Sequence, residues 1–171
     1  MKAASLKEIR QGLKNQSPQE LLELCGTLAK YSKENKELLT YLLFEAVDEV
    51  GYIASIKRLI EEEFTQLAGK RYYQKAKMVR KILKNTKKYI KYSKKKETEI
   101  ELLIHFCAQM LHQKPSLLKG TAMQSLYERQ LDLVMKAIDK LHEDLQFDYE
   151  SMMESQGLVQ NTRCLPQSTE E

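Results

Sequence analysis

A lysine-rich stretch in the middle of the chain holds the residues best suited to chemistry. Residues 70–96 contain thirteen basic residues and no Asp or Glu, which gives the segment a charge of +13. Residues 1–69 sum to −2 (nine basic, eleven acidic) and residues 97–171 to −7 (six basic, thirteen acidic), so the net charge of +4 hides a basic middle between acidic flanks. Lysine ammonium groups neutralise phosphates and release their counterions. The pattern therefore predicts a polyanionic partner.

Placed on a helix at about 100° per residue, this stretch has an apolar stripe for a core and a cationic face on the opposite arc. Lysines three and four residues apart repel each other by about 0.2–0.5 kcal/mol per pair, so helix stability alone would favour glutamate at some of these positions. We therefore expect the cationic face to have an anionic partner. The predicted polyanion-binding residues are Lys77, Arg80, Lys81, Lys84, Lys87, Lys88, Lys91 and Lys95.

RNA is the partner we expect first for this basic helix (71–95). Tyr73 and Tyr92 lie near the cationic arc, where they are placed to stack on bases. The stretch has only two arginines and no nucleic-acid-binding fingerprint, so we expect largely non-specific contact with phosphates. A protein-interaction scaffold is the alternative, in which an acidic protein surface or a second copy of the chain docks on this face.

The cationic face also has explanations that need no partner. Water alone can cover it, or acidic residues of the same chain can neutralise it. An anionic membrane is a weaker alternative, because the apolar stripe opposite the lysines is needed for the core. The acidic residues considered as internal partners are Glu61, Glu62, Glu63, Asp139, Glu143 and Asp144.

Other reactive residue types form no recognisable site. The sequence has no nucleophile elbow, Walker loop, HExxH motif or dinucleotide-binding glycine pattern. Glu101 with His105 and Asp139 with His142 each share a helix face, and two such pairs on facing helices can hold a metal. The full Glu-x-x-His pairs of di-iron bundles are absent, however. We predict no catalytic residue, metal or cofactor, and a protein that is not an enzyme.

Helix start and stop signals predict an all-α fold of about seven helices. Ser5 with Glu8 and Ser17 with Glu20 fit capping boxes, and Thr121 with Gln124 is expected to open the last helix in the same way. The tetrapeptide KYSK occurs at residues 30–33 and 91–94, which suggests two related helical hairpins. The hairpins are expected to pack as a helical bundle or a short HEAT/TPR-like solenoid. The expected helices span about 5–14, 17–31, 38–50, 53–67, 71–94, 97–112 and a long C-terminal helix, 121–152.

Glycines, cysteines and chain length complete the expectations. Gly51 is expected to end or kink the third helix, and Gly69 to stop the fourth. Three widely spaced cysteines make no disulfide framework, so Cys25 and Cys107 are expected in the core of a cytoplasmic protein. The length suits a single domain over residues 1–155, followed by a disordered tail, 156–171. No apolar run approaches the roughly 20 residues of a membrane span, so we expect no membrane partner.

The N-terminal part of the chain resembles a known group of proteins. Residues 17–46, SPQELLELCGTLAKYSKENKELLTYLLFEA, combine a Ser-Pro helix start with the run KENKELLTYLLFEA, and a lysine-rich helix follows. These features resemble an uncharacterised family of small all-helical bacterial proteins with no assigned function. The resemblance covers about the first hundred residues. It implies a cytoplasmic bacterial helical protein, and it brings no activity, cofactor or site residue.

Overall fold

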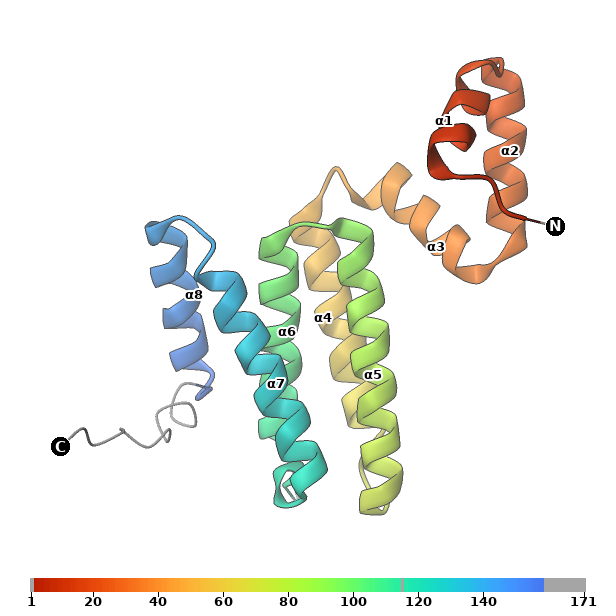
Figure 1. Cartoon of the computed structure of the whole chain (residues 1–171). Coiled ribbons are helices and arrows are strands. Elements are labelled where there is room, and N and C mark those ends of the chain that lie inside the picture. The colour runs from red at the N-terminus through yellow and green to blue at the C-terminus, as the bar shows by residue number, and fades with distance from the viewer. Residues whose placement is uncertain (1, 115, 159–171) are drawn as a thin grey trace. The chain divides into compact units, whose positions relative to one another are not determined.

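The computed structural model describes residues 2–114 and 116–158, and within these residues it contains eight α-helices and no strand (Figure 1). The all-α prediction is confirmed, with one helix more than expected. The helices are α1 (Leu6–Lys14), α2 (Pro18–Tyr31), α3 (Lys33–Thr40), α4 (Glu49–Thr65), α5 (Tyr72–Ser93), α6 (Lys96–Leu111), α7 (Thr121–Ile138) and α8 (Glu143–Ser155).

Contacts between the helices divide the chain into two compact units. The N-terminal unit comprises the described residues up to Val47, with α1, α2, α3 and a π-helical turn, Tyr41–Glu45. The C-terminal unit begins at Asp48 and comprises α4 to α8. A single domain over residues 1–155 stays a prediction. The predicted tail, 156–171, lies for the most part outside the described residues.

The helices of the N-terminal unit are defined by their caps. Ser5 and Ser17 each accept the backbone N–H of a glutamate three residues later, and that glutamate, Glu8 or Glu20, accepts the serine N–H at 2.7 Å in return. Both predicted capping boxes are therefore confirmed. No residue of α1, α2 or α3 is buried, in contrast to Tyr41 in the π-helical turn.

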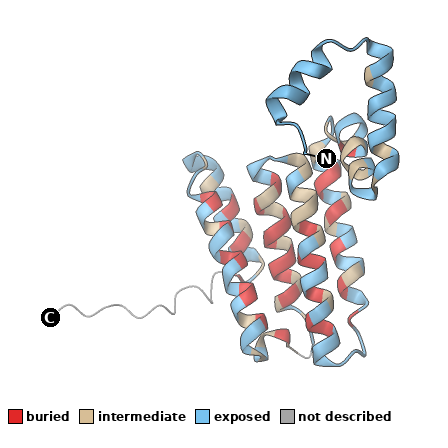
Figure 2. Ribbon diagram, turned by 45° about the vertical axis from the view of Figure 1, so that its right-hand side comes forward, coloured by how far each residue is buried: buried red, intermediate tan, exposed pale blue. Residues whose placement is uncertain are grey.

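The C-terminal unit is built around α6. This helix is buried on nearly all sides, as expected of a helix with apolar residues around its whole circumference. Figure 2 shows the same concentration of buried residues in the neighbouring helices of this unit. Phe64 of α4 and Phe106 of α6 meet edge to face, with ring centroids 5.6 Å apart. The buried residues of α6 are Thr98, Ile100, Leu102, Leu103, Ile104, Phe106, Cys107, Ala108 and Met110.

The predicted long C-terminal helix is wrong, because the chain turns between α7 and α8. Helix α7 ends at Ile138, and His142 is the N-cap of α8. The Gln146 side chain donates to the Asp139 carbonyl at 3.4 Å and the Leu141 carbonyl at 2.9 Å. These bonds satisfy carbonyl groups that a continuous helix would pair internally, and so they stabilise the break. The apolar spacing of three and four continues through the turn, which is why it predicted one helix.

Three local predictions also differ from the structure. Gly51 lies in the first turn of α4, where its N–H donates to the Asp48 carboxylate at 2.9 Å. A side chain at Gly51 would collide with that carboxylate, so the glycine accommodates a cap instead of ending a helix. Thr121 is the first residue of α7, after Gly120 as N-cap and with no side-chain cap bond. Cys25 is exposed, whereas Cys107 is buried as predicted and its pKa is raised to about 12 by burial.

Candidate functional site

Helix α5 holds its lysine-rich sequence in place through a buried stripe. Ala76, Val79, Ile82, Leu83 and Thr86 are buried, which fixes the opposite arc toward solvent. The helix starts after Arg71, whose N–H donates to the Gln74 side chain at 3.2 Å. It ends at Ser93, and its C-cap residue Lys94 has a left-handed backbone with φ of 60°. Its 22 residues give a rigid rod about 33 Å long.

Seven of the eight predicted binding residues share one face of this rod, and the eighth, Lys95, follows its end as the N-cap of α6. Six of the eight are exposed, and Lys87 and Lys88 are half-buried. Positions 77, 81, 84, 88 and 91 follow alternating steps of four and three, so their side chains form one row along the helix. We call the exposed residues of this row and their neighbour Arg80 the cationic face. Its members are Lys77, Arg80, Lys81, Lys84 and Lys91.

Two of the eight residues are engaged within the C-terminal unit. Lys95 Nζ lies 3.0 Å from Glu49 Oε2, and the other carboxylate oxygen, Oε1, accepts hydrogen bonds from the hydroxyls of Ser93 and Thr98 at 2.5 Å. Lys88 Nζ lies 4.9 Å from the centre of the Tyr89 ring, in a cation–π contact. The Glu49 pairing was not predicted, because Glu49 is 46 residues from Lys95 in the sequence and only the fold brings them together.

Lys87 stands at the edge of the cationic face. Burial is the main cause that lowers the pKa of Lys87. The charge of Glu99 opposes this shift, and the charge of Arg129 adds to it. These two groups belong to α6 and α7, so Lys87 is oriented partly toward the neighbouring helices. It is consequently a weaker candidate for ligand contact than the exposed lysines.

Two of the acidic residues suggested as internal partners contact other residues. Glu61 Oε1 is 3.2 Å from His105 Nε2, and Glu63 accepts a bond from Asn85 at 3.4 Å. Arg80 donates to the Ala76 carbonyl at 3.4 Å and so stays on its own helix. Among the residues that the structure describes, the five members of the cationic face have no ion pair: Lys77, Arg80, Lys81, Lys84 and Lys91.

The two tyrosines predicted to stack on bases differ in how far their rings are exposed to solvent. Tyr73 is exposed at the start of α5, so its ring is accessible. Tyr92 is half-buried and packs edge to face on Tyr89, with centroids 6.2 Å apart. Tyr73 is therefore the better placed of the two for stacking.

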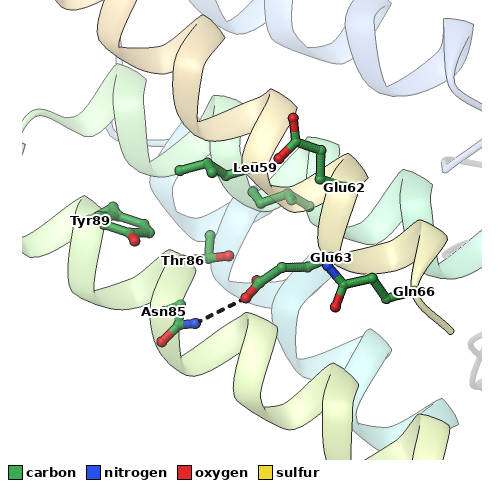
Figure 3. Close-up of a pocket in the computed structure, with 8 residues that line it drawn as sticks. Leu59, Glu62, Glu63, Gln66, Asn85, Thr86 and Tyr89 are labelled. Carbon is green, nitrogen blue, oxygen red and sulfur yellow. Dashed lines mark hydrogen bonds between the residues drawn. The ribbon is translucent and has the colours of Figure 1, made fainter.

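A pocket of about 210 Å³ lies between α4 and α5 (Figure 3). Glu62 and Glu63 of α4 and its C-cap residue Gln66 line it on one side, and Asn85, Thr86 and Tyr89 of α5 line it on the other. The Asn85 side chain reaches across to the Glu63 carboxylate, as the dashed line in Figure 3 shows. Carboxylates repel phosphate, so a polyanion that follows the lysines would avoid this pocket.

The histidine and carboxylate pairs considered as metal ligands contact other residues or lie at helix ends. Glu101 accepts a 2.7 Å hydrogen bond from Lys57, and His105 lies against Glu61, so both α6 residues face α4. Asp139 closes α7, while His142 opens α8. In the described part of the chain, no three His, Cys, Asp or Glu side chains are grouped so that they could share a metal ion.

Comparison with known proteins adds no family to this description. No protein-family model matches the chain. No curated protein matches its sequence, and no solved structure matches its fold. Among the described residues, no helix combines the length and the apolar character that crossing a membrane requires. The resemblance of the N-terminal stretch to small bacterial helical proteins stays a prediction.

Proposed function

We propose that this protein is a non-enzymatic binding module whose cationic face on α5 engages a polyanion, with RNA as the first candidate. The observation that carries the proposal is the set of five exposed cations on one side of a rigid helix that have no ion pair among the described residues. Like charges at these spacings cost helix stability, and a row of phosphates would offset that cost.

The spacing of the cations suits a phosphate backbone. Lys77 and Lys91 are fourteen residues apart, which places their backbone positions about 21 Å apart along the helix. A single strand of nucleic acid can follow such a row through its backbone, with Tyr73 available for a base. Lysine predominates over arginine, so the contacts supply charge more than base recognition. We accordingly expect the protein to bind RNA with little preference for its base sequence.

Fluorescence anisotropy with labelled single-stranded RNA at two or more salt concentrations tests the proposal. The variant K77E/K81E/K84E reverses three exposed cations. It should weaken binding strongly and lower the slope of log K against log salt by about 2, because each lost single-strand phosphate contact contributes about 0.7.

The matched control is K119E/K136E/K140E, which makes the same charge change at exposed lysines outside α5. It should leave the salt slope unchanged. Equal losses in both variants would show a response to net charge alone. If the native protein binds no RNA or DNA even at low salt, the polyanion proposal is wrong, and an acidic protein partner becomes the hypothesis to test by pull-down.

A further inference from the structure

Two helices of the C-terminal unit begin without the residues that usually neutralise a helix N-terminus. Of the eight described helices, only α5 and α7 have neither a side chain that accepts a first-turn N–H nor an acidic residue in the first turn. The N-cap of α5 is Arg71, whose guanidinium cannot accept a hydrogen bond, and the N-cap of α7 is Gly120. The first N–H groups of both helices therefore have no partner within their own helix, and the helix dipole makes both ends positive.

The two helix starts lie next to each other at one end of the unit (Figure 1). Tyr72 is the first residue of α5, and its hydroxyl lies 3.5 Å from the carbonyl oxygen of Leu117, in the turn that precedes α7. The same hydroxyl packs so closely on Gly120 that a Cβ at this position would collide with it. Glycine at position 120 therefore allows the close approach of the two N-termini.

The sequence around both helix starts carries only positive charge. Residues 66–76 lead into α5 and residues 116–127 lead into α7, and together they contain four basic residues and no Asp or Glu. Helix N-termini bind anions because their free N–H groups and the dipole both favour negative charge. Two neighbouring N-termini suit an anion that has several acceptor oxygens.

Lys75 is an independent indication that an anion binds at this end. It lies one turn inside α5 and is only 5% exposed, which is unusual for a lysine. Its ammonium group has no hydrogen bond and no ion pair with any described residue. Long side chains lean toward the N-terminus of their helix, so this group is directed back over the first turn of α5. A buried charge without a partner costs free energy, and a bound anion would offset that cost.

We propose that this end of the C-terminal unit binds a phosphate monoester group, held by the first N–H groups of α5 and α7 and by Lys75. A monoester has three acceptor oxygens and a charge of about −1.5 to −2, so it can serve two helix starts and an ammonium group together. Its source is either the terminal phosphate of an RNA or a free phosphate, which present the same oxygens. The site lies outside the cationic face, so it stands independently of the polyanion proposal.

Titration of the full chain with inorganic phosphate, followed by residue-resolved NMR at constant ionic strength, tests the proposal. Amide signals of Tyr72, Tyr73, Thr121 and Ala122 should shift together and saturate, because their N–H groups bind the anion. Chloride at the same ionic strength should not cause these shifts. Shifts that do not saturate, or that appear equally at the starts of other helices, overturn the proposal.

Lys75→Met removes the ammonium group and keeps an unbranched side chain in the buried position. It should raise the phosphate dissociation constant at least ~10-fold, because a hydrogen bond to a charged group is lost. Its free energy of unfolding without phosphate should not fall, because the lost charge had no partner. Lys140→Met is the matched control at an exposed lysine beyond the other end of α7, and it should bind phosphate like the native protein. If Lys75→Met loses stability but binds phosphate normally, Lys75 is purely structural and the proposal is wrong.

Ala122→Glu provides a variant that folds whatever the role of Lys75. Ala122 is exposed in the first turn of α7, where a carboxylate favours the helix but repels an anion. The variant should keep its stability and bind phosphate at least ~10-fold more weakly, whereas the neutral Ala122→Gln should change phosphate binding much less. Equal phosphate binding by the two variants contradicts a site at the start of α7.

The source of the phosphate is identified with one RNA sequence made with a 5′-phosphate, a 3′-phosphate or only hydroxyl ends. If the site binds an RNA end, one phosphorylated form should bind at least ~10-fold more tightly than the hydroxyl form, and Lys75→Met should abolish only this difference. Equal binding of the three RNAs, with saturable shifts by inorganic phosphate, assigns the site to a free phosphate. K77E/K81E/K84E should lose RNA and still bind phosphate, so failure of one proposal is distinguished from failure of the other.

Discussion

The unit whose helices begin with the more complete caps is not the unit that builds a core. Helices α1 and α2 have complete capping boxes, whereas α6 and α7 have no side-chain cap at all. Yet α6 is the most buried helix of the chain, and α1 and α2 bury nothing. The contrast separates two contributions to structure: caps decide where a helix begins, and burial decides how much free energy holds it in place.

The largest difference between the units should appear when a buried ring is removed. Phe106→Ala deletes a fully buried side chain that packs against Phe64, and it should lower the free energy of unfolding by about 3–5 kcal/mol. Urea denaturation monitored by far-UV circular dichroism measures the change. Phe147→Ala is the control in the same unit, because that ring is 73% exposed, and it should change stability by less than about 0.5 kcal/mol. Similar losses for the two variants would contradict the assignment of the core.

Sequence reasoning succeeded where a pattern is local. The capping boxes at Ser5 and Ser17 depend on residues three apart, and the structure contains both. The buried stripe of α5 follows from the helical period, which also places the cationic face in solvent. The starts of α1 and α2 and the orientation of α5 therefore required no tertiary information.

Several predictions failed because the structure depends on contacts that helical periodicity does not report. The turn between α7 and α8 is stabilised by Gln146, whose long side chain reaches back across the break, and apolar periodicity carries no such information. Cys25 lies in an apolar pattern, but the N-terminal unit supplies no core to bury it. The pairing of Lys95 with Glu49 likewise requires α4 and α5 to be placed first. Local patterns specify faces, and the fold decides what each face meets.

Removing a single N-cap should have a smaller effect, and it should destabilise the N-terminal unit alone. Ser17→Ala removes the hydroxyl that accepts the Glu20 N–H at the start of α2. It should destabilise this helix by about 1 kcal/mol, because the amide loses its partner. The change should appear as faster hydrogen exchange within α2, while the urea midpoint of the C-terminal unit stays the same.

Ser17→Asp tests the interpretation of that cap. An aspartate carboxylate can accept the same N–H, so exchange in α2 should return toward the native rate. If Ser17→Ala instead shifted the unfolding of the C-terminal unit as much as that of α2, the cap would act on both units and the contrast between them would be wrong.

The smallest expected effect is a difference in the pH at which each unit loses stability. In the C-terminal unit, burial lowers the pKa of His105 below its ordinary 6.5; the nearby Glu61 raises it and Lys57 lowers it. The unfolded chain then binds more protons than the folded one, so stability is present above pH 6.5 and is lost as pH falls through the folded pKa. In the N-terminal unit, hydrogen bonds from Ser5 and Ser17 lower the pKa of Glu8 and Glu20 below 4.5. Their contribution is present above pH 4.5 and is lost only below it.

Residue-resolved NMR spectra at about pH 7.5, 5.5 and 3.5 can follow the two units separately. Amide signals of α4 and α6 should respond only as the pH falls below 6.5, and signals at the starts of α1 and α2 only below 4.5. Urea denaturation of His105→Gln should show a flatter dependence of unfolding free energy on pH between 7.5 and 5.5, because the variant lacks the histidine that gains a proton on unfolding. His112→Gln replaces an exposed histidine at the end of α6 and serves as the control. If it flattened the profile as much as His105→Gln, the pH dependence would come from exposed histidines, and burial in the C-terminal unit would not be its cause.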